Sequence, residues 1–221
     1  MKRIDLKWAD TVPEQTRTAV IEALERFPAN ALETYQTHRR STVGRVSIGG
    51  CWFVIKRYNV PKPSTRLRLV LGVSPAGRAW KNAAVARQIG IATPLVVGIA
   101  TVGPWGHLQP GAYLVTEYLQ AQTIDMFLES AQMSVERKRT VADRVLQAVQ
   151  RLHAHGYVHG DLKAKNILVS NDVPYFIDLD TVGRPLLRCN RRRGMAQDYE
   201  RLFLTNPLLL DYADWIPDRS L

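Results

Sequence analysis

The alternation of apolar and polar positions divides the first half of the chain into a helix, a hairpin, a second helix and two further strands. Residues 14–27 carry apolar side chains at helical spacing, directly after a proline typical of a helix start. The runs 43–48 and 52–55 flank Gly49-Gly50, and a glycine pair between two β-type runs indicates a hairpin turn. The remaining elements are predicted at 75–89, 92–103 and 111–119, with Pro61 and Pro63 ending the strand before them.

The second half of the chain is predicted to be mainly helical. Ser134 is a good N-cap for a long helix whose apolar face continues to Leu152, and Gly156 stands where that helix would end. Two short β-type runs follow, and a basic stretch then leads into a helix predicted near residues 196–204. Strands give way to helices near residue 118, which predicts a boundary between two lobes at this point.

Charge is divided near the same residue. Residues 1–116 hold 16 Lys or Arg against 6 Asp or Glu, whereas residues 117–221 hold 14 of each. We therefore predict one α+β domain made of two lobes, residues 1–118 and residues 119–221.

The interval from residue 34 to residue 116 contains 11 basic residues and no acid, so it cannot neutralise its charge locally. Two interpretations stay open. A charge run of this kind can be a solvated basic face. It can also bind an anionic partner, for which phosphates, a nucleic acid and an anionic membrane surface are the candidates.

Composition narrows the class of protein. A hydrophobic fraction of 46% and a charged fraction of 23% are those of an ordinary globular protein. The sequence has no apolar run close to the roughly 20 residues that span a bilayer, and its first residues lack the apolar segment of a secretory signal. The 2 cysteines lie far apart in the sequence and are predicted to be free thiols. We expect a cytoplasmic protein.

The stretch YVHGDLKAKNILV places a cluster of polar side chains between two apolar runs. It contains H-G-D-L-x-x-x-N, from His159 through Asp161 to Asn166. Two apolar runs follow this motif, and Asp178 stands at the end of the second one. Together with Lys56, in the upstream run FVIKRY, these residues resemble the protein-kinase-like phosphotransferases in kind and order. The other interpretation is a turn built from Asp and Asn hydrogen bonds beside an ordinary strand lysine.

Phosphoryl transfer from ATP explains why these residue types would occur together, because it needs the triphosphate charge neutralised and an alcohol held in line. Asp161 can accept the proton of the alcohol, and Lys163 can meet the transferring phosphate. Asn166 and Asp178 supply oxygen ligands of the kind that Mg²⁺ prefers. His159 is expected to pack and orient the loop rather than to react.

ATP binding is assigned to the first lobe and its boundary. Lys56 would reach the phosphates as a point charge from a rigid strand. The backbone of the segment from Glu117 to Leu119 would form the hinge that meets the adenine. The expected cofactors are therefore ATP and Mg²⁺.

A narrower resemblance rests on RAWKNAAVARQIGIATPLVVG, AYLVTEYL, HGDLKAKNILV and FIDLD, which are similar to the bacterial lipopolysaccharide kinase family of Kdo and heptose kinases. The resemblance implies a protein-kinase-like fold, with an antiparallel sheet and helix in the first lobe and a reduced, mainly helical second lobe. It implies an ATP- and Mg²⁺-dependent kinase that phosphorylates a sugar of an anionic glycolipid, in peripheral contact with the cytoplasmic face of the inner membrane.

A basic cluster after the metal-site aspartate fits such an acceptor, since guanidinium groups bind phosphate well. The cluster consists of Arg188, Arg191, Arg192 and Arg193. A solvated loop is the alternative for the same residues. Only 41 residues follow Asp180, and no A-P-E motif occurs among them. A peptide-binding platform has no room there, so a peptide substrate is disfavoured.

Two features depart from the kinase pattern. The helix after Lys56 contains no acid to pair with it, so Asn82, Gln88 or a carboxylate of the other lobe would have to hold the lysine. A G-x-G-x-x-G loop is also missing, and the region around Arg39, Arg40 and Gly44 would have to cover the phosphates instead.

The sequence therefore leaves four candidate functions. The first is a working kinase, favoured by the intact Asp161, Asn166 and Asp178. The second is an inactive kinase-fold protein that binds an anionic glycolipid or another phosphate-rich partner. A small-molecule antibiotic phosphotransferase is less favoured, because its cationic substrates need an acidic pocket. Nucleic-acid binding is the weakest, because no aromatic platform is interleaved with the basic residues.

Overall fold

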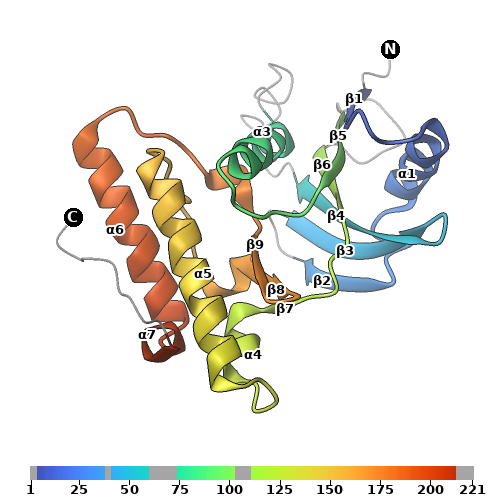
Figure 1. Ribbon diagram of the computed structural model, residues 1–221. Helices are drawn as coiled ribbons and strands as arrows, with labels where there is room; N and C mark the ends of the chain where they lie inside the picture. The colour runs from blue at the N-terminus through green and yellow to red at the C-terminus, as the bar shows by residue number, and fades with distance from the viewer. Residues whose placement is uncertain (1–3, 38–40, 60–73, 103–110, 213–221) are drawn as a thin grey trace. The chain divides into compact units, whose positions relative to one another are not determined.

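A computed structural model describes residues 4–37, 41–59, 74–102 and 111–212 (Figure 1). The chain forms two compact units. The first consists of Met1–Lys81 and Leu95–Tyr118, and the second of Asn82–Pro94 and Leu119–Leu221. The first unit is built around an antiparallel sheet and the second is mainly helical, which gives the α+β class that the sequence predicts.

The first unit contains a six-stranded antiparallel sheet in the order β1-β5-β6-β4-β3-β2. Its strands are β1 (Ile4–Trp8), β2 (Glu33–Thr37), β3 (Ser41–Ile48), β4 (Cys51–Asn59), β5 (Val96–Val102) and β6 (Gly111–Glu117). The predicted hairpin is β3 and β4, with Gly49 and Gly50 at φ angles of 58° and 79°. Few residues other than glycine adopt such angles readily.

The sequence analysis missed β1 and β2, the two edge strands. In β1, IDLKW, apolar and charged residues alternate, and Leu6 and Trp8 are partly buried against the core of the first unit. This alternation was a signal that the sequence analysis overlooked, whereas β2, ETYQT, has no such alternation of apolar residues. Charged side chains on an edge strand discourage pairing with other chains.

Helix α1 (Glu14–Arg26) packs on one face of this sheet, as Figure 1 shows. Its residues Val20, Ala23 and Leu24 are buried in one cluster with Val46 of β3 and Ile55 of β4. The predicted helical stripe is therefore confirmed, and its burial supplies the hydrophobic core of the first unit.

Helix α3 (Pro75–Gln88) begins and ends where the sequence predicts. The Ser74 hydroxyl accepts a hydrogen bond from the Gly77 N–H at 2.9 Å, which caps the first turn. Gly90 follows the helix with a φ angle of 75°. Pro61 and Pro63 lie outside the described residues.

The second unit contains the long predicted helix and a small three-stranded sheet, β7-β8-β9. Ser134 caps the long helix by accepting a hydrogen bond from the Arg137 N–H at 3.3 Å, as predicted. The helices are α4 (Ile124–Glu129), α5 (Val135–Ala154), α6 (Arg188–Thr205) and α7 (Leu208–Tyr212). The strands are β7 (Gln122–Thr123), β8 (Ile167–Ser170) and β9 (Val173–Phe176).

The prediction for α6 was wrong at its start, because the helix begins at Arg188 and not near residue 196. Its buried apolar residues, such as Tyr199 and Leu202, occupy only the second half. The first half is basic, and arginine is a good helix former without leaving an apolar stripe. The loop proposed for the basic cluster is thus a helix, which carries Arg188, Arg191, Arg192 and Arg193.

Truncating Leu24 to alanine should destabilise the protein, because Leu24 is 2% exposed at the centre of the first unit's core. We expect a loss of about 2–5 kcal/mol in the free energy of unfolding, measured by chemical denaturation. The control is Leu32→Ala, since Leu32 is 60% exposed and should change stability little. Equal losses for the two variants would contradict the core assigned to α1.

Candidate functional site

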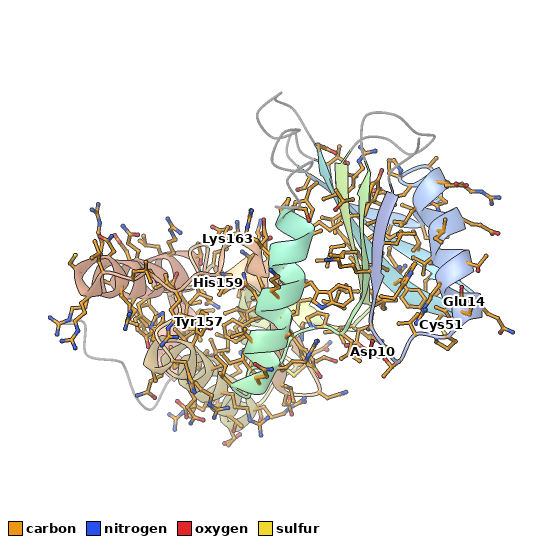
Figure 2. The ribbon with its side chains drawn as sticks, turned by 90° about the horizontal axis from the view of Figure 1, so that it is seen from above. Asp10, Glu14, Cys51, Tyr157, His159 and Lys163 are labelled. Carbon is orange, nitrogen blue, oxygen red and sulfur yellow. The ribbon has the colours of Figure 1, made fainter. Side chains whose placement is uncertain are left out.

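The H-G-D-L-x-x-x-N stretch forms an ordered loop of the second unit between α5 and β8. Figure 2 labels Tyr157, His159 and Lys163, which follow one another along this loop. At its start Val158 pairs with Gly183, through N–H to carbonyl bonds of 2.8 and 3.0 Å in the two directions. A short 3₁₀ turn, η1 (Ala164–Asn166), leads from the loop into β8. The loop is thereby fixed at both ends.

Asp161, Lys163 and Asn166 meet at the tip of this loop. The Lys163 ammonium lies 2.8 Å from Asp161 Oδ2. The Asn166 Nδ2 donates to the Asp161 carbonyl at 2.8 Å and to its Oδ2 at 3.3 Å. The side chains of Lys163 and Asp161 are 39% and 36% exposed, so both remain accessible to a ligand. A carboxylate held by two donors has a fixed direction in which it can accept a proton.

A backbone hydrogen bond also brings together the chain segments that carry the two predicted metal ligands, Asn166 and Asp178. The Ile177 N–H donates to the Asn166 carbonyl at 3.0 Å, and Asp178 is the next residue. Asp178 has φ 62° and ψ 44°, a left-handed conformation that few residues other than glycine adopt, and it turns the chain sharply after β9.

The chemistry of this pair fits Mg²⁺. Because Asn166 uses its Nδ2 to hold Asp161, its amide oxygen is the atom left to face a cation. One neutral oxygen and one carboxylate, with water and phosphate oxygens completing the shell, are the ligands that Mg²⁺ takes in proteins. The described residues hold no group of three or more His, Cys, Asp or Glu that would form an all-protein metal cage.

His159 is fully buried beneath the loop and packs beside Phe176, with ring centroids 6.4 Å apart. Burial lowers the pKa of His159, and the carboxylates of Asp198, Asp178 and Asp161 oppose that shift without cancelling it. The ring is therefore held in its neutral form near neutral pH. This environment suits the expected packing role.

A buried carboxylate that the sequence analysis missed holds the loop from below. Asp198 of α6 is 1% exposed. Its Oδ2 accepts the N–H of His159 at 2.7 Å, and its Oδ1 accepts the N–H of Gly160 at 2.9 Å. His153 Nε2 of α5 lies 3.1 Å from Oδ2. Asp198 thus satisfies one buried and one partly buried backbone donor and ties two helices to the loop.

Two more residues of α6 contact the same loop. Arg201 donates to the Gly160 carbonyl, and the Thr205 hydroxyl accepts the N–H of Ala164 at 2.9 Å. Asp198, Arg201 and Thr205 lie on one face of the helix, since they are three and four residues apart. An acid inside an apolar helical stripe was the signal in the sequence that could have indicated this anchor.

The loop also needs a glycine at residue 160. Gly160 has a φ angle of 82°, and a Cβ atom there would lie 3.1 Å from the Thr181 carbonyl oxygen. The Thr181 hydroxyl in turn donates to the His159 carbonyl at 2.9 Å. The segment after Asp178 therefore packs directly on the H-G-D loop.

Asn82, near the middle of α3, holds the same segment from another side. Its Nδ2 donates to the carbonyls of Leu179 at 2.6 Å and Val182 at 3.0 Å. These carbonyls flank η2 (Leu179–Thr181), the short turn after Asp178. A carboxylate at residue 82 could not make these bonds, because it accepts and does not donate.

The residues predicted to bind ATP lie mainly in the first unit. Lys56 stands on β4 opposite Val43 and Leu114, with its ammonium 4.8 Å from the centre of the Tyr58 ring. At the end of β6, the Glu117 N–H donates to the Leu95 carbonyl at 3.0 Å. The Glu117 carboxylate accepts the Leu95 N–H at 2.8 Å.

Part of the backbone of the hinge proposed at residues 117–119 is therefore already hydrogen-bonded within the protein. The N–H groups of Glu117 and Tyr118 both bond to neighbouring strands, the second to the Trp52 carbonyl at 3.1 Å. If the hinge binds the adenine of ATP, the N–H of Leu119 is the hinge donor that is not used by these two bonds. Arg39 and Arg40, proposed to cover the phosphates, lie outside the described residues, between β2 and β3.

The arginines of the basic cluster have different surroundings. Arg188, Arg192 and Arg193 are exposed on the first two turns of α6. Arg191 is half-buried, and its Nε and one Nη donate to the Pro185 carbonyl at 3.4 and 3.2 Å. Arg191 is therefore engaged with its own chain, whereas the other three point their charge at solvent.

Comparison with known proteins now decides the family. A sequence profile of the lipopolysaccharide kinase (Kdo/WaaP) family matches residues 60–215. The chain belongs to this family. Its fold agrees, because the solved structure of WaaP in complex with acyl carrier protein superposes with a TM-score of 0.63 at 19% identity, over 91% of this chain and 80% of that one. The predicted family and the two-lobed, protein-kinase-like fold are both confirmed.

Similar curated proteins include one named as a kinase and one named as a subunit of the KEOPS complex. The chain is 32% identical to the probable serine/threonine-protein kinase PknB of Lactococcus lactis over 79 residues, which are 35% of this chain and 12% of that protein. It is 28% identical to the KEOPS complex subunit Bud32 of Pyrococcus abyssi over 123 residues, which are 56% of this chain and 50% of that protein. The chain thus spans half or less of these relatives, and the roles of individual residues stay predictions.

Replacing Asp198 by alanine should loosen the H-G-D loop, because the backbone N–H groups of His159 and Gly160 lose their acceptor. We expect a loss of about 2–4 kcal/mol in the free energy of unfolding, together with faster amide hydrogen exchange at His159 and Gly160. Glu200→Gln, an exposed change on the same helix, is the control. Unchanged exchange at the two amides in the Asp198 variant would contradict the anchoring role.

Proposed function

We propose that this protein is a kinase that transfers the γ-phosphate of ATP, with Mg²⁺, to a sugar hydroxyl of an anionic glycolipid. A Kdo or heptose residue of lipopolysaccharide core is the proposed acceptor. One observation carries the proposal. Asp161 is held by Lys163 and Asn166, and the Asn166 carbonyl accepts a hydrogen bond from the N–H of Ile177, the residue before Asp178. Membership of the lipopolysaccharide kinase family supports the acceptor class.

The chemical roles follow from charge and hydrogen-bonding capacity. Asp161 would orient the acceptor hydroxyl and take its proton as the oxygen attacks the phosphorus. Lys163 would move from Asp161 toward the transferring phosphate, where its charge opposes the negative charge of the phosphoryl oxygens. Asn166 and Asp178 would hold Mg²⁺, which supplies further neutralisation of the triphosphate.

ATP would be bound by residues of the first unit and the hinge. Lys56 would contact the phosphates, and the Leu119 N–H with the Glu117 carbonyl would meet the adenine edge. The interval from Thr34 to Thr116 contains no acid, so a carboxylate that approaches the Lys56 ammonium would have to come from outside this interval.

The basic cluster is proposed to serve an anionic acceptor. Arg188, Arg192 and Arg193 present charge to solvent, and Arg191 supports the chain beside them. We also propose that the protein works in the cytoplasm, peripherally on the inner membrane. Among the described residues, no helix has both the length and the apolarity to cross a bilayer.

The second candidate function is a kinase-fold binding protein without turnover. The observation that favours it is the acid-free interval from residue 34 to residue 116, which removes the usual partner of the strand lysine. The two candidates differ in one measurable respect, because only the kinase requires Asp161 to be a base.

Asp161→Asn should abolish phosphate transfer, because the amide keeps the shape of the carboxylate but cannot accept a proton. We expect turnover to fall by about 10²- to 10⁴-fold, while ATP affinity, measured by calorimetry, stays within about three-fold of the original. Asp211→Asn, an exposed change on α7, is the control. Unchanged turnover in the Asp161 variant would remove this residue from the mechanism.

Asp178→Asn should weaken the binding of Mg²⁺-ATP far more than that of metal-free ATP. The loss removes the one anionic ligand of the proposed metal site, and we expect about a ten-fold or larger effect with Mg²⁺ present. Calorimetric titrations with and without Mg²⁺ measure both affinities. Equal losses under the two conditions would argue against a metal role, and absence of ATP binding by the unaltered protein would favour the binding-protein candidate.

A further inference from the structure

Two consecutive leucines immediately before α6 are exposed to an unusual degree. Leu186 is 94% exposed, the highest value among the large hydrophobic residues that the structure describes, and Leu187 is 62% exposed. Single exposed leucines are common on protein surfaces, but two adjacent side chains held out in water have no folding benefit. Their position therefore calls for a contact outside the chain.

Exposed arginines follow directly. The interval from residue 181 to residue 197 contains five arginines and no acid. We define the Leu-Arg patch as Leu186, Leu187, Arg188, Arg192 and Arg193, all of them exposed. Arg188 and Arg192 are one helical turn apart, so they share a face of α6.

The charge of the patch is not explained by helix stability. Cations are favourable at the end of a helix and unfavourable at its start, where the backbone N–H groups carry partial positive charge. Helix α6 nevertheless has no acid in its first turn, and Leu187 at its N-cap supplies no side-chain hydrogen bond. An external anion would relieve this repulsion.

The patch is braced against the rest of the second unit. Arg191 donates to the Pro185 carbonyl, and the Arg184 guanidinium lies 5.8 Å from the centre of the Tyr157 ring. Gly183 pairs with Val158 at the start of the H-G-D loop. The leucines thus lie in a segment that contacts the rest of the second unit through Gly183, Arg184 and Arg191, and these contacts hold its backbone near that loop.

We propose that the Leu-Arg patch docks the protein on an anionic lipid bilayer. The leucines would enter the boundary between headgroups and acyl chains, and the three guanidinium groups would bind lipid phosphates. Exposed apolar side chains flanked by basic ones match the two layers of such a surface. The inference deepens the proposed function, on which it rests for its purpose, because docking would bring the loop carrying Asp161 to acceptors embedded in the membrane.

A bilayer fits the patch better than a protein partner does. Charges of one sign on exposed, flexible side chains suit a surface of many equivalent phosphates, whereas a protein interface normally buries a central apolar pocket or anchor.

Vesicle co-sedimentation of the full chain tests the proposal. Vesicles of phosphatidylcholine alone are compared with vesicles containing about 30 mol % phosphatidylglycerol, at about 0.1 M salt and at higher salt. We expect binding to the anionic vesicles that weakens as salt rises. Changing Arg188, Arg192 and Arg193 together to glutamine should weaken it by about five-fold for each arginine, hence on the order of a hundred-fold, and should flatten the salt dependence.

The leucines are tested separately. Leu186→Ser with Leu187→Ser should weaken binding to anionic vesicles by about ten-fold or more, while the salt dependence that remains is as steep as before. Leu204→Ser is the matched control, because Leu204 is 75% exposed at the other end of the same helix. Changing Arg26, Lys81 and Arg87 to glutamine controls for the loss of three exposed charges elsewhere.

Three outcomes would overturn the docking surface. They are no binding of the unaltered protein to anionic vesicles, equal losses in the patch variants and their controls, and an arginine variant that binds anionic vesicles as tightly as the unaltered protein does. The kinase proposal is tested independently with a water-soluble sugar acceptor, on which the Leu186→Ser, Leu187→Ser double variant should keep full turnover. Vesicle binding without transfer to any acceptor would support the patch and reject the proposed function.

Discussion

The H-G-D loop depends on one buried carboxylate. The backbone N–H groups of His159 and Gly160 both donate to Asp198, the first in a buried hydrogen bond and the second in a partly buried one. Asp198 supplies both oxygens, and the same carboxylate meets His153. Without this contact the loop would have to turn outward to hydrate its donors, and Asp161 would lose the direction that Lys163 and Asn166 help to define.

The local elements were predictable because their signals lie within a few residues. The hairpin at Gly49-Gly50 and the Ser134 cap each follow from neighbouring residues in the sequence. The edge strand β1 was missed although its apolar and charged residues alternate, because the run is short, and β2 was missed because ETYQT has no alternation of apolar residues. The start of α6 was misplaced for a related reason, because its basic first half is stabilised by propensity and not by burial.

The candidate site was predictable only in part. Asp161, Asn166 and Asp178 stand close together in the sequence, in a pattern whose chemistry can be recognised. Asp198 is 37 residues beyond Asp161, counted along the chain, and nothing between them indicates contact. A side chain that positions others must be found from the fold, because its partners are backbone groups that every residue has. Residue spacing can identify reactive groups but not the groups that hold them.

The amide of Asn82 has a consequence for how this fold accommodates a helix without acids. Its two hydrogen bonds point to carbonyl oxygens of Leu179 and Val182, so residue 82 must be a donor. An amide does not titrate, and its hold on the segment after Asp178 is the same in acidic and alkaline surroundings. A glutamate introduced at this position would therefore come at a cost. It would first set a negative charge against two carbonyl dipoles, so the substitution could become favourable only after that turn had acquired another support.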